Sequence, residues 1–252
     1  MKHWILQKLS LALIGLSVTL SASVAASELL RVSAIPDEAP TELQRKFKPL
    51  GDYLQKSLKR EVVFVPVNDY AAVVEALAAD KVDLAWLGGF TFVQAHLKTG
   101  NAIPLVQREE DAKFTSKIIA NTNSGINSLS DLKGKNFAFG SPSSTSGHLM
   151  PRHYLSKNGI EADRDFANMA FSGAHDATAA WVSAGKVQAG ALNASVWDKL
   201  MEQGKIDITK VKVIYTTPHY YDYNWTVRGN LDAELVQAIR KAFLSLDSSN
   251  PE

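Results

Sequence analysis

The segment SPSSTSGHLM, residues 141–150, gathers small hydroxyl side chains where a helical pattern begins. Ser144, Thr145 and Ser146 stand directly before Gly147. The first turn of a helix has backbone N–H groups without partners and carries a partial positive charge. Hydroxyl donors, and a glycine N–H that no side chain screens, would add to these groups. The segment is therefore suited to bind an oxyanion, although a serine cap on a polar loop would use the same residue types.

A second candidate lies where the predicted strand 82–87 ends in the sequence AWLGGF. The glycine pair that ends in Gly89 would let the backbone approach a ligand at the carboxyl edge of a sheet, where α/β folds bind ligands. Trp86 and Phe90 would form the walls of such a pocket, unless Trp86 belongs to the core.

The elements that must hold these residues alternate along the chain. Apolar and β-branched runs predict strands, and helical periodicity predicts helices between them, the clearest at 41–59, 71–79, 147–157, 176–184 and 231–246. This alternation predicts βαβ units and parallel sheets in two α/β lobes. No linker separates the lobes, so we expect two extended crossings, near 116–121 and 223–228. The expected lobes are 27–118 with 224–252, and 119–223.

The N-terminus predicts a cleavable secretory signal over residues 1–26. Lys2 and Lys8 flank an apolar run, 9–20, and small residues fill 21–26. The run is shorter than the about 20 residues that span a bilayer, and a retained anchor is the alternative interpretation. We therefore expect a periplasmic protein.

The composition excludes several classes of function. The chain has no cysteine, a formal net charge of +1 and no basic run, so we expect neither disulfides nor a nucleic-acid or anionic-membrane surface. No G-x-S-x-G motif is present, and the S-x-x-K matches at Ser130 and Ser183 fit a capping turn and a helix end better than catalysis. His148 and His153 lack further ligands for a metal. We expect no enzyme, no metal and no cofactor.

Four long stretches carry a resemblance to a known family. They are VPVNDYAAVVEALAADKVDLAWLGGFTFVQA, SLSDLKGKNFAFGSPSSTSGHLMPRHYL, FSGAHDATAAWVSAGKVQAGALN and IYTTPHYYDYNWTVR. Together they resemble the phosphonate/phosphite-type periplasmic substrate-binding proteins of ABC transporters. The opening SAIPDEAPTELQRKFKPLGDYL is similar to a branch described as binders of selenate or related oxyanions. Members usually continue for some tens of residues beyond a helix such as 231–246, whereas this chain ends at residue 252.

The resemblance implies a type II periplasmic-binding fold, in which two lobes close on a small oxyanion. The protein would be a monomer that delivers its ligand to a permease and touches the membrane only through it. An alternative with the same fold is a binding protein that presents the anion to a membrane histidine kinase.

The resemblance also assigns roles to single residues. His175 would donate to the anion from the second lobe, more strongly if charged, and Tyr70 would reach it from the first. Relatives that bind aminoalkylphosphonates place carboxylates around the amino group, but Asn193 begins a segment without an acid until Asp198. This difference favours a compact inorganic oxyanion. Selenate offers only acceptors, whereas phosphite keeps a proton and would gain from Asp222 as an acceptor.

Overall fold

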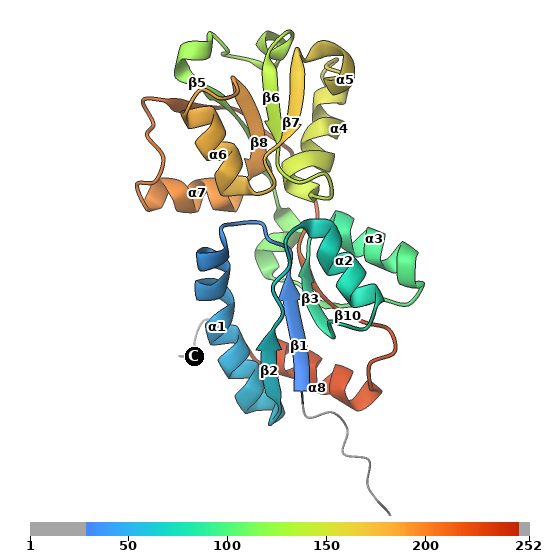
Figure 1. Ribbon diagram of the computed structural model, residues 1–252. Helices are drawn as coiled ribbons and strands as arrows, with labels where there is room; N and C mark the ends of the chain where they lie inside the picture. The colour runs from blue at the N-terminus through green and yellow to red at the C-terminus, as the bar shows by residue number, and fades with distance from the viewer. Residues whose placement is uncertain (1–28, 247–252) are drawn as a thin grey trace, which may run out of the picture.

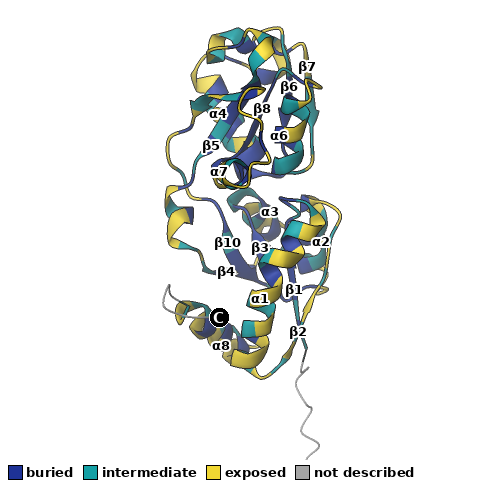
Figure 2. Ribbon diagram, turned by 90° about the vertical axis from the view of Figure 1, so that its left-hand side faces the viewer, coloured by how far each residue is buried: buried dark blue, intermediate teal, exposed yellow. Residues whose placement is uncertain are grey.

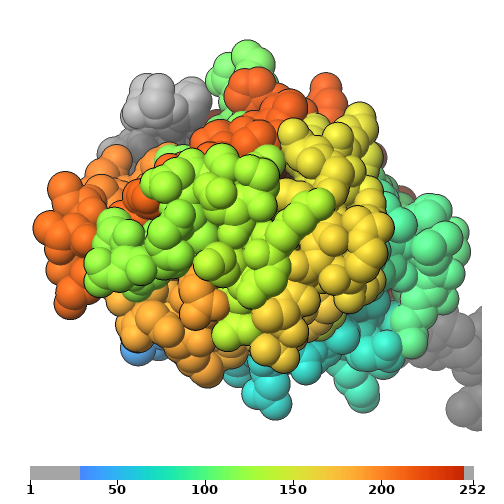
Figure 3. Space-filling model, turned by 90° about the horizontal axis from the view of Figure 1, so that it is seen from above, coloured from blue at the N-terminus to red at the C-terminus, as the bar shows by residue number. Residues whose placement is uncertain are grey.

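The computed structural model describes residues 29–246, and the predicted signal segment lies outside them. The described chain forms two α/β lobes stacked end to end, each built on a five-stranded sheet (Figure 1). Seen from above, the second lobe covers most of the first, which shows only at the rim (Figure 3). The two predicted α/β lobes are therefore present.

The first lobe begins with β1 (Leu29–Ala34) and ends with α8 (Ala233–Leu244). Between them lie α1 (Pro40–Leu58), β2 (Glu61–Phe64), α2 (Tyr70–Ala78), β3 (Leu84–Leu87), α3 (Gly89–Thr99), β4 (Ile103–Val106) and, after the second lobe, β10 (Asn224–Val227). The sheet order is β2-β1-β3-β10-β4, with β10 antiparallel to both neighbours. Helix α2 begins at Tyr70 because the Asp69 carboxylate caps it, accepting from the Ala72 N–H at 2.8 Å.

The second lobe has the sheet order β7-β6-β8-β5-β9. Its strands are β5 (Ser116–Asn121), β6 (Asn136–Phe139), β7 (Asn168–Phe171), β8 (Ala189–Asn193) and β9 (Val211–Thr216). Its helices are α4 (Met150–Lys157), α5 (Ala162–Asp165), α6 (His175–Ser183) and α7 (Ala194–Glu202). Strand β7 and helix α5 were not predicted, because each has only four residues and too little pattern to stand out.

The predicted crossings were wrong. The chain crosses between the sheets over residues 107–115 and 217–223, where Phe114 and Tyr220 form an isolated antiparallel bridge. The segments 116–121 and 223–228 instead contain β5 and β10, so the expected boundary after residue 118 falls inside β5. Both strands run antiparallel to their neighbours, which also makes the sheets mixed rather than parallel. Strands β5 and β10 each follow a crossing between the lobes and so are not part of a βαβ unit. The residues of such a strand do not indicate whether it pairs parallel or antiparallel.

Each sheet is covered on both faces, and the helices turn their exposed sides outward (Figure 2). In the second lobe, Ile118 packs with Leu155 on the α4 face, while its neighbour Ile119 packs with Val182 and Trp197 on the face of α6 and α7. This is the alternation expected of a strand buried on both sides. Within residues 29–246, no helix is long and apolar enough to cross a membrane.

Candidate functional site

The hydroxyl-rich segment faces the first lobe at the start of a distorted helix. Residues Thr145–Leu149 form one π-helical turn before α4, and the Leu149 N–H donates to the Ser144 C=O at 3.0 Å. Ser144 is the N-cap, because its Oγ accepts from the Gly147 N–H at 2.9 Å. That N–H, predicted to be open to a ligand, thus has a partner within the chain. Thr145 and Ser146, both buried, follow the cap, and the first turn leaves their N–H groups without intrahelical partners.

Two hydrogen bonds join this segment and the second crossing to the glycine-rich start of α3. The Phe90 N–H donates to Thr145 Oγ1 at 2.9 Å, and the Gly89 N–H donates to Asp222 Oδ1 at 3.0 Å. A Cβ placed on Gly88 would lie 3.1 Å from both Thr145 Oγ1 and Asp222 Oδ1. The glycine pair therefore lets the start of α3 approach Thr145 and Asp222 closely, whereas the close approach to a ligand stays a prediction.

Asp222 is buried, and its Oδ2 atom has no hydrogen-bond partner among the described residues. Burial raises the pKa of Asp222 to about 7, although the Gly89 N–H and the nearby hydroxyls of Thr145 and Ser146 oppose the rise. The group can therefore accept or donate a hydrogen bond near neutral pH. Its open oxygen lies in the interior between the lobes.

Tyr70, His175 and Tyr223 converge at the same interior. His175 Nε2 lies 3.4 Å from the hydroxyl oxygens of both Tyr70 and Tyr223, so one imidazole meets a tyrosine of α2 and a tyrosine of the second crossing. The Asn193 N–H points at His175 Nδ1 at 3.3 Å, which leaves the proton of a neutral ring on Nε2. Tyr70 thus faces the second lobe, and the ligand contact that the resemblance implies for it stays a prediction.

His175 is neutral in this setting. Burial lowers the pKa of His175 to about 4, and the charges of Asp37 and Asp176 oppose this only in part. A charged histidine, considered from the sequence, is therefore not what the structure holds near neutral pH. The imidazole acts as a neutral N–H donor.

The side chain of Asn193 is hydrogen-bonded to protein groups at both ends and helps to hold Tyr223 and His175 in place. Its Oδ1 caps α7 by accepting from the Val196 N–H at 3.0 Å, and its Nδ2 donates to the Tyr223 hydroxyl at 3.0 Å. Both ends of the amide thus have protein partners, and Asn193 fixes the position of Tyr223.

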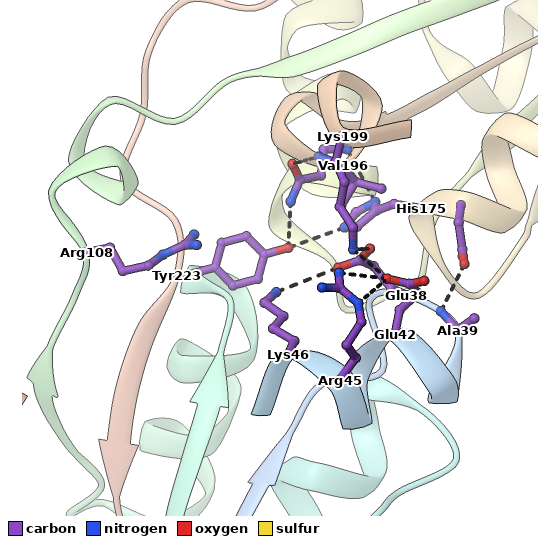
Figure 4. A network of polar contacts seen from close by, with 12 residues as sticks. Glu38, Ala39, Glu42, Arg45, Lys46, Arg108, His175, Val196, Lys199 and Tyr223 are labelled. Carbon is purple, nitrogen blue, oxygen red and sulfur yellow. Dashed lines mark hydrogen bonds and ion pairs between the residues drawn. The ribbon is translucent and has the colours of Figure 1, made fainter. Parts of the chain in front are cut away.

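Trp86 stacks against the other side of the site. Its ring is parallel to that of Tyr223, with centroids 5.1 Å apart, and the Arg108 guanidinium lies 4.9 Å from the Trp86 centroid. Figure 4 shows Arg108 and His175 at opposite ends of Tyr223. Trp86 is therefore part of the core of the first lobe, yet its buried Nε1 has no hydrogen-bond partner in the described chain.

An ion cluster joins the lobes beside this interior. Glu38 contacts Lys199 of α7 and lies 3.8 Å from Lys46 of α1 (Figure 4). Glu42 lies 3.1 Å from both Lys199 and Lys205. These pairs line one side of an interlobe hollow of about 1120 Å³. The candidate residues lie deeper, since Tyr70 and His175 are no more than 1% exposed. A ligand must therefore enter while the lobes are apart.

The structure brings the predicted site residues to the boundary between the lobes, except Trp86, which lies in the core of the first lobe and stacks on Tyr223. It also places two further buried residues there that were not predicted. Asp37 follows β1, and Tyr223 ends the second crossing. Tyr223 was placed in a hinge on the sequence, and Asp37 follows a proline in what looks like an ordinary turn. The one available signal was that each lies at the end of a strand or crossing that leads to the cleft.

Two sheets joined by two crossings, with a buried polar site closed between them, define a protein that binds its ligand by bringing two lobes together. The chain belongs to the family of phosphonate periplasmic substrate-binding proteins of ABC transporters, whose family model matches residues 32–252.

Known proteins of this family are similar over most of the chain. A probable ABC transporter phosphite-binding protein of Prochlorococcus marinus is 38% identical over 226 residues, which cover 87% of this chain and 76% of the relative. The structure of PhnD1 from that organism with methylphosphonate has a TM-score of 0.84 and 36% identity, covering 88% of this chain and 86% of that one. A phosphate-import protein of Mycolicibacterium smegmatis is 31% identical over 228 residues, 86% of this chain and 71% of its own length.

These comparisons confirm the predicted fold class, because a solved structure of the family superposes on both lobes. They also confirm that the chain is a transport-related binding protein rather than an enzyme.

Proposed function

We propose that this chain captures a small phosphorus oxyanion that keeps a proton, such as phosphite or methylphosphonate, and delivers it to the permease of an ABC transporter. The observation that carries the proposal is the open, buried oxygen of Asp222 beside Thr145 and Ser146. A protonated oxyanion would donate to this oxygen and accept from the hydroxyls. The names of the relatives, which refer to phosphite, phosphate and methylphosphonate, support the same class.

In this proposal each lobe supplies neutral donors. Thr145, Ser146 and His175 Nε2 donate from the second lobe, and Tyr70 donates from the first. Gly89, Phe90 and Trp86 shape the pocket, while Ser144, Gly147 and Asn193 hold the donors in place. Because these contacts come from both sides, the ligand favours the closed arrangement, which is the form that docks on the permease. The protein acts as a periplasmic monomer after removal of residues 1–26.

Selenate is the competing ligand. A fully ionised anion offers no proton to the ionised form of Asp222 and can only accept from its protonated form, so it fits the site less well. Isothermal titration of the purified protein with phosphite, methylphosphonate, phosphate, sulfate and selenate tests the ranking. We expect phosphite or methylphosphonate to bind at least about tenfold more tightly than selenate, a difference that one unmatched buried polar group can produce. Tighter binding of selenate would reject the phosphorus assignment.

The competing role is sensing, in which the closed protein presents the anion to a membrane histidine kinase. The binding site is the same in both roles, so the partner distinguishes them. Ligand-dependent co-purification with a permease supports transport, and ligand-dependent binding to a sensor kinase supports sensing.

A further inference from the structure

Asp37 lies in the loop between β1 and α1, and the sequence predicted no role for it. The residue is 1% exposed, and its Oδ1 atom has no hydrogen-bond partner among residues 29–246. Burying a carboxyl oxygen without a hydrogen-bond partner costs free energy, so a reason for this burial must be sought. A ligand that brings a donor to this oxygen would supply it.

The backbone of Asp37 is held by both lobes. Its N–H donates to the Ile35 C=O at 2.9 Å across Pro36, whose ring fixes φ and favours this tight turn. Its C=O accepts from the His175 N–H, also at 2.9 Å, at the start of α6. When the lobes are together, the place of Asp37 relative to His175 is therefore fixed.

The side chain borders the same interior as the candidate site. Burial is the largest cause of the raised pKa values of Tyr70 and Tyr223, and the charge of Asp37 is the next cause for both. For His175, burial lowers the pKa and the charge of Asp37 is the largest opposing cause. Both tyrosine hydroxyls lie 3.4 Å from His175 Nε2, so the carboxyl of Asp37 lies within electrostatic range of the point where the three side chains meet.

No nearby cation in the described chain neutralises this carboxyl. Lys46 and Lys199 pair with Glu38, and Arg108 pairs with Asp111. Asp176, the other acid near His175, accepts from the Ala39 N–H at 2.9 Å. The interior between the lobes thus contains two carboxyl oxygens without hydrogen-bond partners in the described chain, Asp37 Oδ1 and Asp222 Oδ2, which a ligand could contact.

We propose that Asp37 is a specificity-determining residue that accepts a hydrogen bond from the single O–H group of a singly ionised phosphorus oxyanion when the Asp222 carboxyl carries its own proton. When Asp222 is ionised, it accepts that hydrogen bond instead. The inference rests on the proposed function and deepens it. An anion without a proton could accept a hydrogen bond from the protonated Asp222 but would offer none to Asp37, so Asp37 would exclude sulfate-like dianions while it favours hydrogen phosphonates. Asp222 alone would give weaker discrimination.

The test compares three proteins: the wild type, Asp37→Asn and Glu38→Gln. Asparagine keeps the shape of Asp37 and removes its charge. Glu38 is the neighbouring acid, but its partners Lys46 and Lys199 lie in the ion cluster outside the donor site. Titration calorimetry uses methylphosphonate and sulfate at about pH 6, where a phosphoryl group of this kind carries a proton in part and sulfate carries none.

We expect Asp37→Asn to lower the preference for methylphosphonate over sulfate at least tenfold. Glu38→Gln should change both affinities by a similar factor, because it affects lobe closure for any ligand. An equal change for both anions in Asp37→Asn would overturn the inference and give Asp37 a purely structural role. If the asparagine variant lacks a cooperative melting transition, Asp37→Ser gives the same comparison with a smaller neutral side chain.

A third ligand separates an O–H donor from an ammonium donor. If aminomethylphosphonate binds the wild type more tightly than methylphosphonate and loses this advantage in Asp37→Asn, Asp37 binds an amine and the inference is overturned. Failure of the proposed function has a different result, because the wild type would then bind none of these phosphorus anions.

Discussion

The Thr145 hydroxyl of the second lobe accepts a hydrogen bond from the Phe90 N–H of the first lobe, at 2.9 Å. Because its oxygen is the acceptor in this bond, the hydroxyl proton is left to donate to the Asp222 carboxyl, whose pKa it helps to lower, or to a ligand. One side chain thus joins the lobes and faces the site. Closure and binding are therefore linked through the same atom.

Removing the hydroxyls of this turn should weaken binding and leave the fold intact. We expect Thr145→Ala with Ser146→Ala to lower the affinity for methylphosphonate at least about tenfold, because two donors at about 1 kcal/mol each are lost from a buried site. Titration calorimetry measures the loss. Ser143→Ala, in the same loop before the cap, is the matched control and should bind like the wild type. Unchanged affinity in the double variant would place the anion elsewhere.

Replacing Asp222 by asparagine should change the dependence of stability on pH. Since the pKa of Asp222 is raised to about 7 in the folded protein, the folded state binds the proton more tightly, and its stability falls as pH rises from about 4 to about 7. Asp222→Asn lacks this loss. The free energy of unfolding of Asp222→Asn, minus that of the wild type, should therefore increase over that range, by on the order of 2–4 kcal/mol at pH 8.

Urea unfolding at several pH values without ligand measures this difference. The lowered pKa of His175, about 4, has the opposite effect between about pH 4 and 6.5, but it is common to both proteins and cancels in the comparison. A difference that stays constant from pH 4 to 8 would contradict a raised pKa for Asp222.

Gly147 should tolerate no side chain. A Cβ at this position would lie 3.0 Å from both His175 Cε1 and Ser144 Oγ, and 3.2 Å from Gly140 Cα. We expect Gly147→Ala to destabilise the protein by about 1–3 kcal/mol and to weaken ligand binding, because the imidazole must move. Thermal and chemical unfolding measure the first effect, and calorimetry measures the second.

Gly51 provides the control, because a Cβ there would meet only Val62 Cγ1, at 4.0 Å, in the middle of α1. Gly51→Ala should raise stability by about 0.5–1 kcal/mol through its better helix propensity. Equal effects of the two alanine substitutions would remove the packing argument for Gly147.

The ion cluster at Glu38 should help hold the lobes together without ligand. Lys199→Gln removes the cation that Glu38 and Glu42 share across the cleft, so we expect a larger radius of gyration for the ligand-free variant in small-angle scattering. Lys46→Gln is the control, because Lys46 contacts Glu38 within the first lobe. If both variants keep the wild-type radius, other contacts hold the lobes together.

The sequence predicted best those elements in which regularly spaced apolar residues extend over many positions. Helix α1, predicted at 41–59, runs over Pro40–Leu58, and α2, predicted at 71–79, runs over Tyr70–Ala78. Strand β10 was not predicted, since the four residues of Asn224–Val227 pair only with strands some 120 positions or more away. Pairing partners that distant leave no local pattern.

The site shows the same limit at the level of single residues. The Ser144–Gly147 segment was identifiable because helix-capping chemistry depends on neighbours in sequence. The roles of Asp37 and Tyr223 depend on residues from the other lobe, His175 and Asn193, which no spacing rule connects to them. Gly147 was expected to donate its N–H to a ligand, but the local cap takes that N–H, which only the geometry of the π-helical turn reveals.

Strand β10 has a consequence for how the molecule is made. It lies between β3 and β4, and β4 has no other strand beside it in the described sheet. During synthesis, Ile103–Val106 therefore has no strand to pair with until Asn224–Val227 leaves the ribosome, after the whole second lobe has been made. The second lobe can complete its sheet first, and the first lobe forms around a strand that arrives last. The sheet of the first lobe therefore stays incomplete until Asn224–Val227 has been synthesised.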